Sequence, residues 1–179
     1  GHVEAHARFG TASAIGAEGR LDFARLRTER YASPGALPTP EFGATIEADL
    51  ARRDFSVNAL ALCLAGPRGG ELLDPYGGLE DLTRGRLRAL HADSFRDDAT
   101  RIWRGARYAA RLGLRAEAGT RAAIEAGARW LASISGERLW AELERTAAEP
   151  SPLRALVLLA DWGALAATAP GLRLHPDSR

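Results

Sequence analysis

The chain is organised around Phe95-Arg96-Asp97-Asp98-Ala99-Thr100-Arg101-Ile102-Trp103-Arg104-Gly105-Ala106-Arg107-Tyr108. From Asp97 onward its pattern predicts a helix of about three turns that is rich in carboxylates and arginines. Residues three apart are neighbours on a helix surface, so we expect Asp98 and Arg101 to lie side by side. Arg104 and Arg107 continue the three-residue step and form a slanting stripe. Taken alone, such a stripe is also typical of a solvated charged face.

The composition limits the classes of protein that the chain can belong to. Its 179 residues, 46% hydrophobic and 26% charged, suit one sizeable folded domain or two small ones. No run of 18 or more apolar residues is present, which argues against a membrane span. All 24 basic residues are arginine, whose planar group offers paired donors to phosphates and base edges. One cysteine, Cys63, and four histidines without metal-ligand spacing favour a reducing, cytoplasmic location.

The first half of the chain predicts a mixture of strands and short helices. Thr45 is a candidate cap for a helix that reaches Arg53. The expected elements, in chain order, are an irregular or edge segment over 1–20, a strand over 20–27, a proline-rich loop over 34–40, a buried strand over 58–64 with a partner at 71–73, a short helix over 79–83 and a strand over 86–90.

The second half predicts helices only. The first ends before Gly113, a residue suited to the left-handed conformation that follows a helix. A second is expected over 120–130, a third after Ser135, and a fourth after Ser151-Pro152, where proline suits the first helical position. Trp130, Trp140 and Trp162 are predicted to fill the shared core of these helices.

Four motifs in order carry a resemblance to a known family. These are Ala51-Arg52-Arg53-Asp54-Phe55-Ser56-Val57-Asn58-Ala59-Leu60, Asp74-Pro75-Tyr76-Gly77-Gly78-Leu79-Glu80-Asp81-Leu82, Asp97-Asp98-Ala99-Thr100-Arg101 with Arg107–Gly113, and Ile134-Ser135-Gly136-Glu137-Arg138. Together they resemble the class II tRNA nucleotidyltransferases (CCA-adding enzymes) and bacterial poly(A) polymerases. The resemblance implies an α+β fold: the C-terminal part of a polymerase-β-like nucleotidyltransferase head with a mixed sheet, followed by an all-α neck. The implied domains are a truncated head over 1–91, a nucleotide-selecting neck over 92–147 and the start of a helical body over 148–179.

The resemblance also implies an activity. Such enzymes add CMP or AMP from CTP or ATP to the 3′ end of tRNA or other RNA without a template strand, so protein groups must read the incoming base. Asp98 and Arg101 match the family's base-reading pair. A carboxylate accepts a hydrogen bond from the exocyclic amine of cytosine or adenine, while a guanidinium donates to the neighbouring ring nitrogen. Arg104 and Arg107 match arginines that help to hold the nucleotide.

Further candidates come from the first motif and from the strand before it. Arg53 matches an arginine expected at the phosphates and Asp54 a ribose contact; for both, an ion pair between the short helix and the neck is the alternative. Asn58 could bind the nucleotide or satisfy the backbone. Asp22 is a candidate third carboxylate for Mg²⁺, against an ion pair with Arg25 or Arg27 at a sheet edge.

The family's opening motifs, a glycine-rich phosphate loop and two metal-binding aspartates one residue apart, are not found in residues 1–20. The chain also holds no methionine and begins at Gly1. We therefore expect a piece that lacks its N-terminal segment, or one chain of a split enzyme, and expect it to be inactive alone. A poly(A) polymerase and a non-catalytic RNA-binding relative remain the alternatives. Glu137 and Arg138 are interpreted as a helix-start ion pair.

Overall fold

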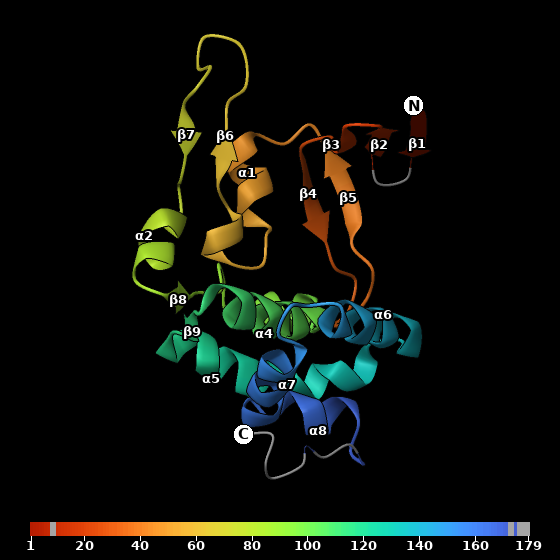
Figure 1. Ribbon diagram of the computed structural model, residues 1–179, viewed down its shortest axis with the longest axis vertical. Coiled ribbons are helices and arrows are strands. Elements are labelled where there is room, and N and C mark those ends of the chain that lie inside the picture. Colours follow the sequence, from red (N-terminus) through yellow and green to blue (C-terminus); the bar gives the residue numbers. More distant parts are fainter. Residues whose placement is uncertain (8–9, 172–173, 175–179) are drawn as a thin grey trace. The chain divides into compact units, whose positions relative to one another are not determined.

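The computed structural model of the protein describes residues 1–7, 10–171 and 174, which form two compact units (Figure 1). The first unit comprises Gly1–Arg30 and Pro38–Arg52, and the second comprises Tyr31–Leu37 and Arg53–Arg179. These units are defined by internal contacts. The division into head, neck and body at 91 and 147 concerns function and stays a prediction.

The first unit contains an antiparallel three-stranded sheet of β1 (His2–His6), β2 (Thr11–Gly16) and β3 (Gly19–Ala24). Val3 pairs with Ala14 and Ala14 with Leu21, so one face of the sheet is apolar, and both Val3 and Leu21 are exposed. The prediction of an irregular or edge segment over 1–20 is right for β1, which is an edge strand, and wrong for β2, which is the central strand of the sheet. Alanine is a weak strand former, so alternation carried by small residues gave little signal.

A hairpin and a short helix complete the first unit. β4 (Arg27–Arg30) pairs antiparallel with β5 (Thr39–Phe42), so the expected proline-rich loop ends two residues earlier than predicted. Pro40 fits β5 because this two-stranded sheet has only edge strands. α1 (Ile46–Ala51) starts as predicted, with the Thr45 side chain accepting a hydrogen bond from the amide of Ala48.

After Arg53 the second unit continues with a short helical turn, η2 (Ser56–Asn58), which ends at the first residue of the buried strand expected over 58–64. Only β6 (Ala61–Leu62) is extended there, paired with β7 (Leu72–Leu73), and Leu64 is 88% exposed. The predicted pairing with 71–73 is confirmed, but the strand is shorter than predicted and is not buried, because the large buried side chains of this region, Phe55 and Val57, precede it. α2 (Gly78–Thr83) and β8 (Arg86–Leu87) follow close to the expected positions.

Helices form the rest of the second unit, and α4 lies at their centre. The elements are α3 (Ser94–Asp97), α4 (Thr100–Leu112), β9 (Arg115–Ala116), α5 (Ala118–Gly127), η3 (Ala128–Ser133), α6 (Gly136–Ala147), α7 (Pro152–Asp161) and α8 (Ala164–Thr168). α4 packs against both α6 and α7 (Figure 1). Its buried side chains Ile102, Trp103 and Ala106 belong to the main hydrophobic core.

Most helix ends follow the sequence signals. Gly113 takes a left-handed conformation with φ 67° after α4, and Pro152 opens α7, as predicted. Ser135 precedes α6, although no side-chain capping bond forms there. The tryptophan prediction is right for Trp162, which is 3% exposed, and wrong for Trp140, which is 61% exposed.

No helix in the described part of the chain is long and apolar enough to span a membrane.

The close approach of α4 to Phe55 makes Gly105 a test of this packing. A Cβ atom added at Gly105 would lie 2.7 Å from Phe55 Cζ and 3.4 Å from Leu87 Cδ2. We expect Gly105→Ala to lower the free energy of unfolding by about 1–2 kcal/mol, because overpacking outweighs the gain in helix propensity. Chemical denaturation measures the change. Gly136→Ala in α6 is the control, since nothing lies within 4 Å of its added Cβ; equal stability of the two variants would contradict the packing.

Candidate nucleotide-binding site

The carboxylate of Asp98 is held in one orientation by three donors. Its Oδ1 atom accepts hydrogen bonds from the amide of Thr100 (3.0 Å), the hydroxyl of Thr100 (2.7 Å) and Nη2 of Arg138 on α6 (2.8 Å). No donor to Oδ2 is found in the part of the chain that the structure describes. The side chain is about one-fifth exposed. One oxygen thus fixes the carboxylate, and the other is available to an incoming group.

The expected helical placement of Asp98 is wrong. Asp98 lies between α3 and α4 in an extended conformation, φ −146° and ψ 99°. A short aspartate side chain that accepts from an amide two residues later competes with helical hydrogen bonding, and this interrupts the helix. Asp98 and Arg101 remain joined through the backbone, where the Arg101 amide donates to the Asp98 carbonyl at 3.1 Å. The uniform slanting stripe is not observed, because each arginine of α4 has its own partners.

Arg101 is buried and contacts three neutral groups. Its Nη1 donates to Ser94 Oγ at 2.8 Å and lies 3.3 Å from His91 Nε2, while its Nη2 donates to the Tyr31 hydroxyl at 3.3 Å. Partial burial, and then the nearby Arg101 charge, lower the pKa of His91. Neutral His91 can accept from Arg101 through Nε2, so the low pKa and the contact are consistent.

Asp54, Asn58 and Arg104 form a second cluster. Asp54 Oδ1 accepts from the Phe55 amide and from Asn58 Nδ2, both at 2.9 Å, and Oδ2 accepts from Arg104 Nε at 2.7 Å. Burial alone would lower the pKa of Arg104, but the Asp54 charge and hydrogen bond, together with smaller effects of Tyr108 and Glu142, outweigh it and raise the pKa. Arg53 is exposed and its Nη1 donates to the Asn58 carbonyl. For Asp54 the observed contacts match the predicted alternative, an ion pair with the neck.

Arg107 points to a different set of partners. It is buried and forms an ion pair with Glu142 on α6, and its Nε lies 3.7 Å from Glu149 Oε1. Arg111 pairs with the same Glu149, which lowers the pKa of that carboxyl group. This network joins α4 to α6 and to the turn before α7. The structure therefore does not bring Arg107 into the Asp98 or Asp54 clusters through any described contact.

Asp22 belongs to the first unit, on β3. Its Oδ1 accepts from Ser13 Oγ at 2.5 Å and from Arg20 Nε at 2.8 Å, and these two bonds lower its pKa. The ion pair is with Arg20, whereas the alternative predicted from sequence was Arg25 or Arg27. Across residues 1–7, 10–171 and 174, no group of three His, Cys, Asp or Glu side chains is placed to hold a metal ion. The described side chains do not fit a magnesium site by themselves.

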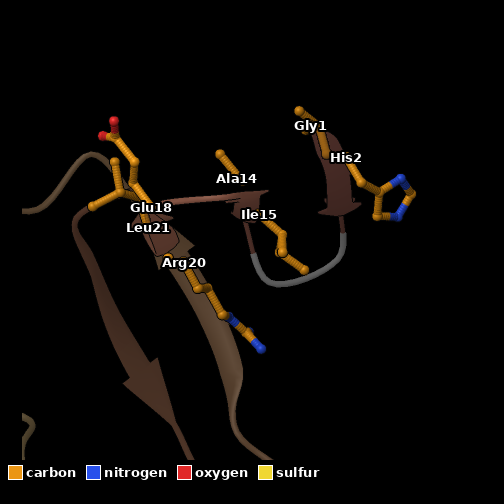
Figure 2. A pocket seen from close by; sticks show the side chains of 10 residues that line it. Gly1, His2, Ala14, Ile15, Glu18, Arg20 and Leu21 are labelled. Carbon is orange, nitrogen blue, oxygen red and sulfur yellow. The ribbon is translucent and has the colours of Figure 1, made fainter.

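The first unit also has a hollow of about 580 Å³ at one end of its three-stranded sheet. Gly1, His2, Ala14 and Ile15 are among its lining residues. Figure 2 shows the side chains of His2, Glu18 and Arg20 pointing in different directions. Because the charged groups do not converge, the hollow is not the candidate site.

Comparison with known protein families identifies the family of the chain. The model of the poly(A) polymerase head domain matches residues 1–88, and that of the probable RNA- and SrmB-binding site of polymerase A matches residues 113–174. The chain belongs to the family of poly(A) polymerases and tRNA nucleotidyltransferases. Asp98 and Arg101 fall between the two matches, at the start of α4.

Relatives of this family align with nearly the whole chain. An A-adding tRNA nucleotidyltransferase from Halalkalibacterium halodurans is 43% identical over 92% of the chain and 40% of its own length. A CC-adding tRNA nucleotidyltransferase from Deinococcus radiodurans is 45% identical over 94% of the chain and 44% of its own length. The chain thus spans less than half the length of these relatives.

Solved structures of the family share the fold. A CCA-adding enzyme in an apo form has a TM-score of 0.90 at 36% identity, over 99% of the chain and 42% of that protein. The Thermotoga maritima CCA-adding enzyme complexed with tRNA has a TM-score of 0.77 at 34% identity, over 98% of the chain and 40% of that protein. The expected nucleotidyltransferase fold, built from helices and small sheets, is confirmed.

The sequence did not reveal which residues hold the side chains of Asp98 and Arg101 in place. Arg138 was interpreted as part of a helix-start ion pair, but it binds Asp98 across 40 residues of chain. Thr100, Tyr31 and His91 were not considered at all. Arg138 lies in a motif that the sequence singled out, so its position was a usable signal. Tyr31 contacts a residue 70 positions away, and no local pattern announces such a contact.

Titration of His91 tests the Arg101 cluster. Its pKa lies below the ordinary value of 6.5, so the unfolded chain binds more protons in the interval between the two values. The contribution of neutral His91 to the free energy of unfolding should have its full value above about pH 7 and should decrease as the pH drops from 6.5 toward the lower pKa. The pH dependence of the histidine ring resonances measures the pKa of His91, and the His91→Gln variant identifies its signal. A His91 pKa at or above 6.5 would contradict the described environment.

Proposed function

We propose that Asp98 and Arg101 read the base of CTP or ATP during template-independent addition of CMP or AMP to the 3′ end of tRNA. The observation that carries the proposal is the fixed Asp98 carboxylate, whose Oδ1 accepts from three donors while the side chain stays about one-fifth exposed. Asp98 lies three residues before Arg101, whose guanidinium is also held by named partners. An acceptor and a donor that are three residues apart in the sequence are thereby each held by named contacts, and base reading requires such fixed groups.

The chemistry of the bases explains the choice of nucleotides. Cytosine and adenine both place an amine donor beside a ring-nitrogen acceptor, whereas uracil and guanine have a carbonyl where the amine would be. A carbonyl oxygen facing Asp98 Oδ2 would bring two acceptors together without a hydrogen between them. Specificity then comes from repulsion of the wrong base as well as attraction of the right one.

The second cluster supports the nucleotide in a different way. Arg104 and Asp54 form a partly exposed ion pair, with Asn58 bound to the same carboxylate. We propose that Arg53, which is exposed next to this cluster, contacts the phosphates of the nucleotide. A ribose contact by Asp54 and a nucleotide contact by Asn58 and Arg104 remain predictions. Arg107 is paired with Glu142, so a nucleotide contact there would require the nucleotide to compete with that carboxylate.

For the complete protein we propose tRNA end maturation in place of poly(A) addition. The relatives named as A-adding, CC-adding or CCA enzymes are 37–45% identical to the chain, and one neighbouring structure is a complex with tRNA. Activity of this family involves Mg²⁺, which supplies charge stabilisation at the transferred phosphate. The residues described here would position the nucleotide. The role of Asp22 as a metal-binding carboxylate remains a prediction.

Exchange of the acceptor tests the base-reading pair. In Asp98→Asn the amide can donate a hydrogen bond as well as accept one, so a carbonyl facing residue 98 is no longer rejected. We expect the preference for CTP over UTP to fall by about tenfold, the scale of a lost base contact. Equilibrium binding of CTP, ATP, UTP and GTP to the purified chain measures it. Asp161→Asn, on the exposed end of α7, is the control; a ratio within twofold of the parent in Asp98→Asn would refute the assignment.

Removal of the donor tests the other half of the pair. Arg101→Ala deletes a guanidinium expected to donate to the ring nitrogen of both cytosine and adenine, so affinity for CTP and ATP should fall together. A loss of about 1–3 kcal/mol is expected for such a contact. The same binding assay reports it, alongside the thermal midpoint of the variant. Undiminished affinity of a folded Arg101→Ala chain for both nucleotides would show that Arg101 does not contact the base.

A further inference from the structure

His91 lies between β8 and α3, beside the guanidinium of Arg101. Its carbonyl accepts a hydrogen bond from the Ser94 amide at 3.2 Å, which closes a turn. Both side chains of this turn contact the same nitrogen: Nη1 of Arg101 donates to Ser94 Oγ at 2.8 Å and lies 3.3 Å from His91 Nε2. One short turn therefore supplies two acceptors for Nη1, one for each of its hydrogens.

The contact with Arg101 depends on the protonation state of the His91 ring. A guanidinium group has only donors and stays charged in proteins. The contact is therefore a hydrogen bond only when Nε2 carries no proton, and the proton of the neutral ring then lies on Nδ1. A protonated ring would direct an N–H group at the Nη1 donor and would bring two positive charges together. Only the neutral ring can hold Arg101 through this contact.

The two partners differ in their access to solvent. Arg101 is 6% exposed, so a hydrogen of Nη1 that loses its acceptor would find little water to replace it. His91 is only half-buried, and its ring can exchange a proton with solvent. Protonation of the ring would therefore act on a guanidinium that cannot easily find other acceptors, and we expect that guanidinium to change position.

The charged groups that act on His91 come from three positions in the chain. Arg101 on α4 disfavours the protonated ring, whereas Asp93, before α3, and Asp97, the last residue of α3, favour it. Tyr31 lies on the far side of the guanidinium, where its hydroxyl accepts from Nη2. Burial and then Arg101 outweigh the two carboxylates, so the pKa of His91 lies below its ordinary value. The ring is thus neutral at pH 7 and becomes protonated in acid.

From these contacts we infer that His91 is a positioning residue for Arg101 that acts only in its neutral form, so that protonation of its ring weakens the binding of CTP and ATP. This inference rests on the proposed base-reading function of Arg101. It adds a group that acts through Arg101 without touching the base. It also makes nucleotide binding depend on pH through one identified ring.

Binding of the base and protonation of His91 are then linked. A base that accepts from Arg101 needs the guanidinium in its observed place, so it binds the neutral form of the chain more tightly. Protonation should lower the affinity for CTP by about three- to tenfold, the range expected for one hydrogen bond. Linkage is reciprocal, so bound CTP should lower the pKa of His91 by the logarithm of the same factor, about 0.5 to 1.

The experiment measures CTP affinity of the purified chain between about pH 5 and pH 8, the interval in which histidine titrates. The terminal phosphate of CTP titrates in the same interval, so the parent chain is compared with His91→Gln, which shares that effect. The glutamine amide offers an acceptor in place of Nε2 and takes up no proton. The ratio of the parent's dissociation constant to that of the variant should rise by about three- to tenfold toward pH 5. A ratio constant within twofold would overturn the inference.

A second measurement does not require the whole pH range. The ring resonances of His91, identified with His91→Gln, report its pKa with and without saturating CTP. The pKa should be lower in the bound chain, by about 0.5 to 1. An unchanged pKa would show that nucleotide binding is not linked to this ring. A higher pKa in the bound chain would show that the nucleotide favours the charged ring, and either result would overturn the inference.

Two further variants separate positioning from a general effect of charge. His2 is an exposed histidine on β1 whose Nε2 lies 3.4 Å from Glu4 Oε1, so His2→Gln is the matched control and should keep the pH profile of the parent. His91→Leu removes the acceptor at every pH, and its affinity for CTP should be low and nearly independent of the histidine charge. A His2→Gln profile that matches His91→Gln, or a folded His91→Leu chain with parental affinity at pH 8, would overturn the inference.

Arg101→Ala separates failure of this inference from failure of the proposed function. If Arg101→Ala loses affinity while the parent and His91→Gln share one pH profile, His91 does not position Arg101, although the base-reading role of Arg101 stands. If Arg101→Ala keeps its affinity, the base-reading assignment fails and the inference falls with it. Circular dichroism at each pH establishes folding. If His91→Leu does not fold, the His91→Gln profile and the ring titration decide the outcome.

Discussion

The burial of α4 obliges the arginine side chains along it to find acceptors. A buried charge without partners costs more free energy than the folded state can absorb, so packing and charge pairing must be solved together. Arg104 meets Asp54, and Arg107 meets Glu142 and Glu149. Arg101 is surrounded by hydroxyl and imidazole groups among its described contacts. The position of α4 thus determines which segments of the second unit must lie against it.

The sequence predicted those features of the fold that depend on neighbouring residues. Gly113 and Pro152 mark helix ends because backbone conformation at one position decides them. The order of four motifs identified the family and the residues worth examining. The conformation of Asp98 was missed, since the competition between its carboxylate and the helical backbone depends on Arg138 as well as on Thr100. Local patterns contain no information on which distant residue will supply that third donor.

The base-reading role of Asp98 and Arg101 stays a prediction, whereas the helical geometry expected for Asp98 is wrong. Helical spacing would have made Asp98 and Arg101 a surface ion pair, and such a pair satisfies itself and offers little to a ligand. The observed arrangement directs one Asp98 oxygen to Thr100 and Arg138, and the Arg101 guanidinium to its own acceptors. An interrupted helix is therefore better suited to base reading than the continuous helix expected from the sequence.

A protein that replaces a template strand has to reproduce the rigidity of a base as well as its pattern of donors and acceptors. A carboxylate or guanidinium that is free to rotate would form hydrogen bonds with several different base edges. Discrimination between bases therefore depends on groups whose positions are held to within about half an ångström. The groups proposed to read the base are held by contacts from four separated segments: Tyr31–Leu37, the stretch from His91 to the start of α3, the junction of α3 with α4, and the start of α6. Because no single element carries the proposed site, the proposed specificity depends on how the second unit packs.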